Sequence, residues 1–213
     1  MQNHLANIIM DWKQLNRELG NIDLYWLDFI LKGNLPEKAK ILDAGCGEGR
    51  NLTYCFKNGM DVFGIDQNPE AIRFLKLSAK QYKVPDIDAR FHVMKLDRIL
   101  FPDTTFDVIV CSAVLHFAKN TAHFEGMLNE LARLLKPRGK MFIRTMTDRY
   151  LPNNSMQLEE GVVRFGNDQS RFVVNVDVFV NYMDTLGLRL IEPYKEVVVQ
   201  SRHAMGTFML EKY

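Results

Sequence analysis

Residues 41–51 read Ile-Leu-Asp-Ala-Gly-Cys-Gly-Glu-Gly-Arg-Asn. The apolar start of this stretch predicts a short buried strand near residues 39–43, and the alternating glycines predict a tight turn into a helix near 48–58. Glycine lacks a Cβ atom, so the backbone of such a turn can bend sharply and a ligand can come close to it. The stretch therefore predicts a strand, a ligand-binding turn and a helix.

A second acid stands where a nucleoside ligand would need it. Asp66 follows a second predicted strand, residues 61–65, and this spacing suits a carboxylate that accepts hydrogen bonds from ribose hydroxyls. A dinucleotide is disfavoured, because Arg50 stands where the dinucleotide fingerprint has glycine or alanine. Asp43 at the strand tip would also repel a pyrophosphate, whereas it suits a ligand that carries an ammonium or sulfonium group.

Length and composition fit one α/β domain over residues 1–213, since 47% of the residues are hydrophobic and can fill a core. The net charge of +1 gives no electrostatic argument for nucleic acid or an anionic membrane, so neither is expected as a partner. No apolar stretch is long enough to span a bilayer. The cysteines lack metal-type spacing and the N-terminus lacks a signal-peptide pattern, so we expect no metal and a reduced, cytoplasmic setting.

Hydrophobic periodicity predicts helices that alternate with buried strands along the chain. Such an alternation, with an antiparallel pair at the end, predicts a doubly wound, mostly parallel sheet with helices on both faces. Ahead of it, residues 5–32 are expected to form one or two amphipathic helices. The less regular stretch 145–175 is expected to hold short strands around 162–165 and 171–174. The remaining predicted strands lie near 89–94, 106–111, 140–144, 188–199 and 206–212, with helices from 68–69, from 120–121 and near 176–186.

Residues 41–51 resemble motif I of the class I S-adenosylmethionine-dependent methyltransferases. Gly-Ile-Asp-Gln-Asn-Pro at 64–69 is similar to the segment that follows motif I in that family. Residues 101–109 resemble the approach to the family's fourth strand, and residues 134–143 resemble its helix, turn and fifth strand. The resemblance extends over roughly residues 36–213.

The resemblance implies a seven-stranded, Rossmann-like sheet whose last strand is antiparallel, with the ligand at the carboxyl ends of the strands. Residues 1–35 would form an N-terminal helical cap or lid, and 145–175 an insert that holds the methyl acceptor. The implied cofactor is S-adenosylmethionine, and the implied partner is a small-molecule acceptor.

Donor-site residues follow from the same resemblance. Asp43 would orient the methionine ammonium group, unless it only pairs with helix backbone, and Asp66 would bind the ribose hydroxyls. Cys46 is expected as a contact or packing residue, because no histidine stands near it to make it a nucleophile. Gln67 would lie beside the adenine or be exposed. The full set expected at the donor is Asp43, Ala44, Gly45, Cys46, Gly47, Gly49, Asn51, Asp66, Gln67, Leu96, Asp97 and Ser112.

One position departs from the family. Many members place an acid soon after the third strand, where it accepts from the adenine amino group. An ungapped alignment back from residues 101–103 puts Lys95 there, and a lysine cannot accept. Asp97 is the nearby alternative, or else a solvated loop acid, and Leu96 would contact the base.

His116 follows the fourth strand at the mouth of the expected site. It could deprotonate a hydroxyl or amine acceptor, or simply close the turn into the next helix. His123 is expected to face solvent, and Arg144 to meet a substrate carboxylate or a local acid. Three N-terminal aromatic residues would form a lid or pack against the domain: Trp12, Tyr25 and Trp26.

The implied reaction is direct in-line displacement at the sulfonium methyl carbon. Positioning of the reactants can supply about 7–11 kcal/mol in favourable cases, and the neutral thioether leaves without an acid. Residues 46–51 are similar to the motif I variant of tellurite-resistance-type methyltransferases, which implies a thiol or other soft nucleophile as acceptor. Two alternatives stay open: a non-catalytic nucleoside-binding or interaction module, favoured by Lys95, and an NAD-type oxidoreductase, disfavoured by the missing glycine.

Overall fold

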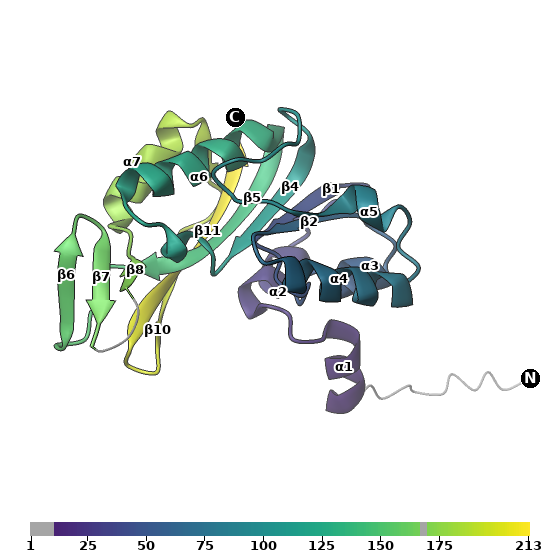
Figure 1. Cartoon of the computed structure of the whole chain (residues 1–213), viewed down its shortest axis with the longest axis horizontal. Helices are drawn as coiled ribbons and strands as arrows, with labels where there is room; N and C mark the ends of the chain where they lie inside the picture. Colours follow the sequence, from purple (N-terminus) through teal and green to yellow (C-terminus); the bar gives the residue numbers. More distant parts are fainter. Residues whose placement is uncertain (1–10, 167–169) are drawn as a thin grey trace, which may run out of the picture.

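A computed structural model describes residues 11–166 and 170–213, which form an α/β fold around one main sheet (Figure 1). The order across the sheet is β3-β2-β1-β4-β5-β11-β10, and β9 also pairs with β11. Its strands are β1 (Lys40–Ala44), β2 (Asp61–Asp66), β3 (Phe91–Val93), β4 (Phe106–Ser112), β5 (Leu135–Thr147), β9 (Leu188–Leu190), β10 (Lys195–Val199) and β11 (His203–Lys212).

The predicted doubly wound sheet with an antiparallel last strand is confirmed. β1 pairs in parallel with β2 and β4, β4 pairs in parallel with β5, and β11 runs antiparallel to β5. One predicted strand, 188–199, is divided into β9 and β10. Pro193 stands between them and has no N–H to donate to a ladder, which accounts for the break. Both pieces lie on the same edge of β11, because β5 covers its other edge.

Helices cover both faces of the sheet and close two hydrophobic cores. The helices are α1 (Trp12–Leu19), α2 (Leu24–Leu31), α3 (Thr53–Lys57), α4 (Pro69–Gln81), α5 (Ile87–Arg90), the 3-10 turn η1 (Leu115–Phe117), α6 (Thr121–Leu134) and α7 (Val176–Thr185). None of them, within the described part of the chain, is both long and apolar enough to cross a membrane.

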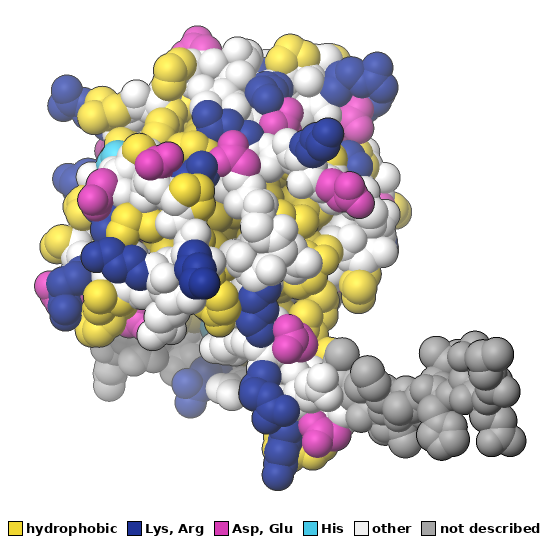
Figure 2. Space-filling model, turned by 90° about the vertical axis from the view of Figure 1, so that its right-hand side faces the viewer, with side chains coloured by type: hydrophobic (Ala, Val, Ile, Leu, Met, Phe, Trp, Pro, Cys, Tyr) yellow, Lys and Arg dark blue, Asp and Glu magenta, His cyan; other side chains and the backbone are white. Residues whose placement is uncertain are grey.

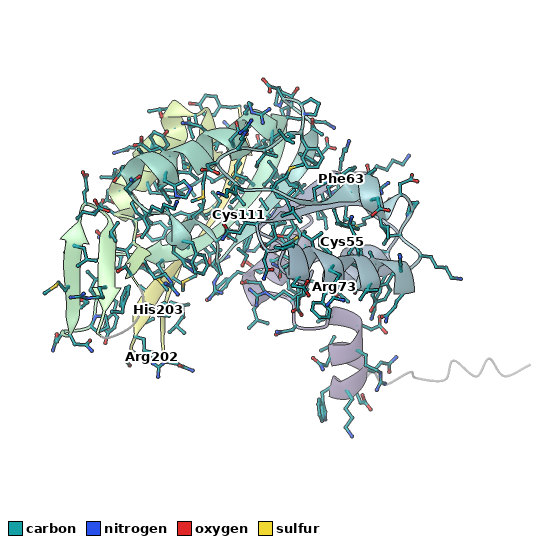
Figure 3. The ribbon with its side chains drawn as sticks, in the orientation of Figure 1. Cys55, Phe63, Arg73, Cys111, Arg202 and His203 are labelled. Atoms are coloured by element: carbon teal, nitrogen blue, oxygen red, sulfur yellow. The ribbon has the colours of Figure 1, made fainter. Side chains whose placement is uncertain are left out.

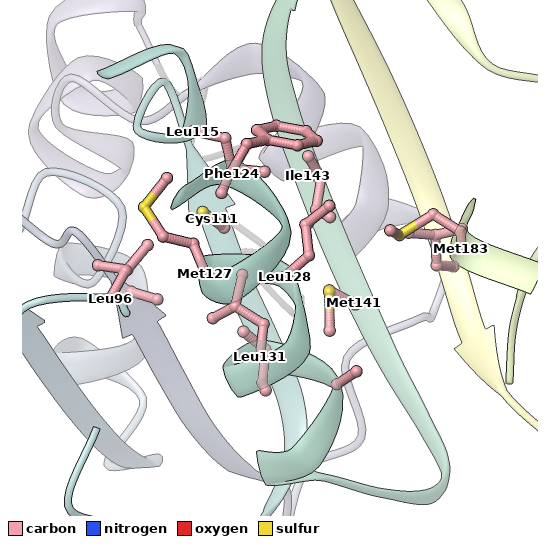
Figure 4. Close-up of a cluster of buried hydrophobic side chains, with 14 of the residues drawn as sticks. Leu96, Cys111, Leu115, Phe124, Met127, Leu128, Leu131, Met141, Ile143 and Met183 are labelled. Carbon is pink, nitrogen blue, oxygen red and sulfur yellow. The ribbon is translucent and has the colours of Figure 1, made fainter. Parts of the chain in front are cut away.

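Helix α6 shows how the sequence pattern becomes packing. Its apolar stripe of Phe124, Met127, Leu128 and Leu131, which recurs at helical spacing, is buried. In Figure 4 this stripe lies beside Cys111 of β4 and Met141 and Ile143 of β5, and Met127 extends toward Leu96. The apolar run of β4 is likewise buried, as a central parallel strand requires.

Two element boundaries differ from the predictions. The helix predicted near 48–58 begins only at Thr53, because Gly47 and Gly49 have φ values of 53° and 88° and residues 48–52 form turns. The strand predicted at 140–144 extends over the whole of β5, which continues directly from α6 and pairs Leu135 with Phe106.

The N-terminal helices pack in different ways. Trp26 of α2 is fully buried and stacks on Phe29 with ring centroids 4.9 Å apart, whereas Trp12 of α1 is 73% exposed. The three aromatic residues therefore do not form a common lid. Residues 5–10 of the predicted N-terminal helices lie outside the described residues. On the face shown in Figure 2, basic and acidic side chains are interspersed rather than gathered by sign.

The stretch 145–175 carries a small antiparallel sheet at one end of the molecule (Figure 1). Its strands are β6 (Ser155–Glu159), β7 (Val162–Phe165) and β8 (Ser170–Phe172). The two short strands expected here correspond to β7 and β8. An isolated bridge between Thr147 and Val174 joins the stretch to the end of β5. The small sheet therefore lies beyond the carboxyl edge of the main sheet.

Candidate functional site

A cavity of about 240 Å³ opens at the carboxyl ends of β1, β2 and β4. Parallel strands present the turns that follow them at this edge, so residues far apart in the sequence meet here. Five of the residues predicted to bind the donor line the cavity: Gly45, Asp66, Gln67, Leu96 and Asp97.

Asp66 is held between the glycine turn and the start of α4. Its Oδ2 atom accepts from the Gly47 N–H at 2.9 Å, and its Oδ1 atom accepts from the Asn68 N–H at 2.8 Å. Asn68 in turn caps α4 through the Glu70 N–H. A carboxylate oxygen can accept two hydrogen bonds, so both atoms keep capacity for a pair of hydroxyls.

Two glycines of the turn combine a positive φ value with a close neighbour, so a side chain at either position is disfavoured. Gly45 has a φ of 81°, and a Cβ atom there would lie 2.3 Å from Cγ2 of Val114. Gly49 has a φ of 88°, and its Cβ atom would lie 2.3 Å from Cδ1 of Leu75. Side chains at these positions would combine backbone strain with steric overlap.

The Asp43 side chain is buried, and one of its carboxylate oxygens accepts no hydrogen bond from the described residues. It is only 1% exposed, and its Oδ2 atom has no hydrogen-bond partner among the described residues. Burial raises the pKa of its carboxyl to about 7, against the opposing effect of Arg50. A buried acid with a free acceptor suits a ligand that brings a cationic N–H group.

Three residues predicted to contact the donor have partners within the protein: Cys46, Asn51 and Ser112. Cys46 is buried against Gly64, and burial raises the pKa of its thiol well above the usual value, which speaks against a nucleophile. The Oδ1 atom of Asn51 accepts from the Asp23 N–H at 3.0 Å, and Ser112 Oγ donates to Asp23 Oδ2 at 3.0 Å. Their contact with the donor stays a prediction.

Asp23 was not identified from the sequence, yet it joins four segments at the site. Its side chain is buried and its Oδ2 atom accepts from Arg144 Nη1 at 3.0 Å, with Arg50 Nη2 at 3.6 Å. Its Oδ1 atom caps α2 through the Tyr25 N–H at 2.9 Å. Arg144 thus pairs with a local acid, one of its two predicted roles. Only the cap position could have drawn attention to Asp23, because sequence distance hides its other partners.

His123 and Asp97 form a pair at the cavity wall. His123 Nε2 lies 3.3 Å from Asp97 Oδ2, and its Nδ1 atom accepts from the Lys119 N–H at 3.1 Å. The expectation that His123 faces solvent is therefore wrong: the first turn of α6 directs it to the cavity. Lys95 lines the same cavity, so the departure from the family pattern lies within the site.

His116 lies in η1 and is only 6% exposed. Its Nδ1 atom has no hydrogen-bond partner among the described residues. Burial, together with the charges of Arg171 and Arg144, lowers the pKa of this imidazole to about 4. The ring is therefore neutral at pH 7 and retains an unused polar atom.

A larger cavity of about 840 Å³ lies between the small sheet and the β10–β11 hairpin. Met146 and Phe165 give it apolar walls, and Arg171, Arg202 and His203 give it basic ones. Arg202 and His203 lie at the turn of that hairpin, close to the small sheet (Figure 3). Arg171, which lines this cavity, also lowers the pKa of His116.

Comparison with known proteins relates this chain to methyltransferases. The model of the family described as "Methyltransferase domain" matches residues 42–143. A ubiquinone biosynthesis O-methyltransferase of Xylella fastidiosa is 30% identical over 120 residues, which are 56% of this chain and 47% of that protein. The chain thus spans about half the length of such curated relatives.

Solved structures agree in fold over most of the chain. A methyltransferase from Methanosarcina mazei, described as S-adenosylmethionine-dependent, is 21% identical with a TM-score of 0.69, covering 86% of this chain and 96% of its own. A TehB-like S-adenosylmethionine-dependent methyltransferase from Corynebacterium glutamicum is 25% identical with a TM-score of 0.60, covering 90% and 89%. Residues 42–143 therefore match the methyltransferase-domain family, and the fold around them is similar to that of the class I, S-adenosylmethionine-dependent methyltransferases.

Proposed function

We propose that this chain transfers a methyl group from S-adenosylmethionine to a small-molecule acceptor. The observation that carries the proposal is the cavity at the ends of β1, β2 and β4, where Asp66 and the glycine turn meet. When bound, S-adenosylmethionine supplies an activated methyl group whose departure from sulfur needs no acid. The chain has only to hold donor and acceptor in line and exclude water.

The residues present fit this donor at both of its ends. Asp66 offers both carboxylate oxygens to the ribose hydroxyls, while Leu96 and Met127 give the cavity apolar surface for the adenine. At the other end, the unpartnered oxygen of buried Asp43 would accept from the methionine ammonium group. In this assignment Asp97, which pairs with His123, would accept from the adenine amino group.

The acceptor would occupy the larger cavity, whose walls include Phe165 and Arg171 of the small sheet and the turn of the β10–β11 hairpin. His116 does not line this cavity, but its turn η1 packs against β8, which carries Arg171. Basic side chains there favour an acceptor that carries negative charge, such as a thiolate or another soft anion. The Xylella relative, by its name an O-methyltransferase, supports a hydroxyl acceptor instead. Neutral His116 could take the proton of a hydroxyl, whereas a thiolate would need no base.

The His116→Ala variant separates these acceptors. We expect unchanged affinity for S-adenosylmethionine, because His116 does not line the donor cavity. Turnover on a hydroxyl acceptor should fall by about tenfold or more once the base is removed, whereas turnover on a thiol at a pH where it is ionised should change little. The measurement is S-adenosylhomocysteine release with a panel of small phenols and thiols.

Two outcomes of this assay would contradict the proposal. Equal turnover of wild type and variant on every hydroxyl acceptor would reduce His116 to a structural residue. A wild-type chain that binds the donor but releases no S-adenosylhomocysteine with any acceptor would support the non-catalytic nucleoside-binding alternative.

A further inference from the structure

A third cavity, of about 250 Å³, lies between α6, α7 and the small sheet. Its described lining residues are different from those of the donor cavity and of the larger cavity. Helix α6 separates it from the donor cavity, since Phe124 faces one and Met127 the other. The proposed methyl transfer gives this third cavity no role.

Aromatic rings make up much of its wall. Phe124 of α6 and Phe172 of β8 stack with centroids 4.6 Å apart, and Phe179 of α7 lies 6.0 Å from Phe124. Tyr182 lines the cavity one turn further along α7. The faces of such rings carry negative electrostatic potential and attract organic cations.

The charged residues that line this cavity in the described part of the chain are all acids: Glu125, Asp148 and Glu160. The neighbouring Arg149 forms its ion pair with Asp177 at 3.3 Å, and its charge also acts on Asp148. The aromatic rings and the acidic residues that line this cavity therefore both favour a positively charged ligand.

Asp148 indicates that the ligand carries a hydrogen-bond donor. Its Oδ2 atom accepts from Asn175 Nδ2 at 2.8 Å, and Asn175 also caps α7 through the Val178 N–H, so the carboxylate is fixed in place. Its Oδ1 atom is buried without a hydrogen-bond partner among the described residues. An unsatisfied buried acceptor is costly, and a ligand that donates an N–H would remove the cost. A quaternary ammonium could not do so.

We propose that this cavity is a second ligand site, for a small organic ammonium ion that carries N–H groups on an apolar or aromatic body. The ammonium group donates to Asp148 Oδ1, and the body lies against Phe124, Phe172 and Phe179. The site is opposite in charge preference to the larger cavity, so it does not compete for an anionic acceptor.

The test is calorimetric titration of the whole chain with 2-phenylethylammonium, and with 2-phenylethanol as the uncharged analogue of similar shape. We expect saturable binding of the amine and much weaker binding of the alcohol. Asp148→Asn keeps the size of the side chain and its bond to Asn175, and should weaken amine binding by about tenfold or more. Asp184→Asn removes the same charge from an exposed position on α7 that does not line the cavity, and should leave amine binding unchanged.

Equal affinity for amine and alcohol, no saturable amine binding, or equal effects of the two variants would overturn the proposal. Saturation with S-adenosylhomocysteine should not displace the amine, and displacement would place the amine in the donor cavity instead. Circular dichroism of Asp148→Asn verifies that the variant is folded. Asp66→Ala should bind the amine normally, so this test does not depend on the proposed methyl transfer.

Discussion

The Asp66→Ala variant should bind S-adenosylmethionine and S-adenosylhomocysteine about 100-fold more weakly than the wild type, or worse. Each hydrogen bond to a charged group is worth about 1.5–3 kcal/mol, and the carboxylate would lose two ribose hydroxyls. It would also release the Gly47 N–H and Asn68 N–H, which it now holds at 2.9 and 2.8 Å. Isothermal titration of both nucleosides measures the change.

Asp61→Ala is the matched control, because Asp61 stands at the opposite end of the same strand. Its ion pair with Arg90 is partly exposed, and such pairs contribute little. Donor affinity in this variant should equal that of the wild type. If Asp66→Ala also kept wild-type affinity while remaining folded, the donor would not be at the end of β2.

Gly45→Ala should lower the free energy of unfolding by about 2–5 kcal/mol, since the left-handed backbone and overpacking add their costs. The new Cβ atom would lie 2.3 Å from Val114 Cγ2 and 2.8 Å from its Cγ1. Val114 lines the donor cavity, so relief of this overlap would also distort the site. Urea unfolding and donor titration measure the two effects.

Gly59→Ala separates backbone strain from overlap. Gly59 has a φ of 62°, and a Cβ atom there would meet nothing within 4 Å. We expect a loss of about 1 kcal/mol and no change in donor affinity, because only the backbone conformation is disfavoured. Equal losses in the two variants would show that Val114 does not constrain the turn.

Most of the fold could be predicted from the sequence, because parallel strands buried on both faces are nearly continuous apolar runs. The run that became β4 and the inward stripe of α6 are examples. The start of α3 differs from the prediction, because the sequence does not indicate how many residues the glycine turn takes up before a helix can begin. The division at Pro193 carried a local signal, a proline inside the predicted strand.

The site was predictable where local spacing sets the geometry and not where tertiary contacts do. Gly45 and Asp66 follow strand ends, so their meeting at one edge follows from the topology. Asp23 meets Ser112 and Arg144 only because α2 packs against the strand ends, across 89 and 121 residues of sequence. His123 was placed wrongly, since helical spacing alone does not tell which flank of α6 borders a cavity.

The central claim is tested most directly by calorimetric titration of the chain with S-adenosylhomocysteine, with NADH as the comparison ligand. We predict saturable binding of S-adenosylhomocysteine and no binding of NADH, because the turn at residues 45–49 has an acid at its strand tip and Arg50 in place of the third dinucleotide glycine. Binding of NADH without S-adenosylhomocysteine, or binding of neither, would contradict the assignment of this cavity to a methyl donor.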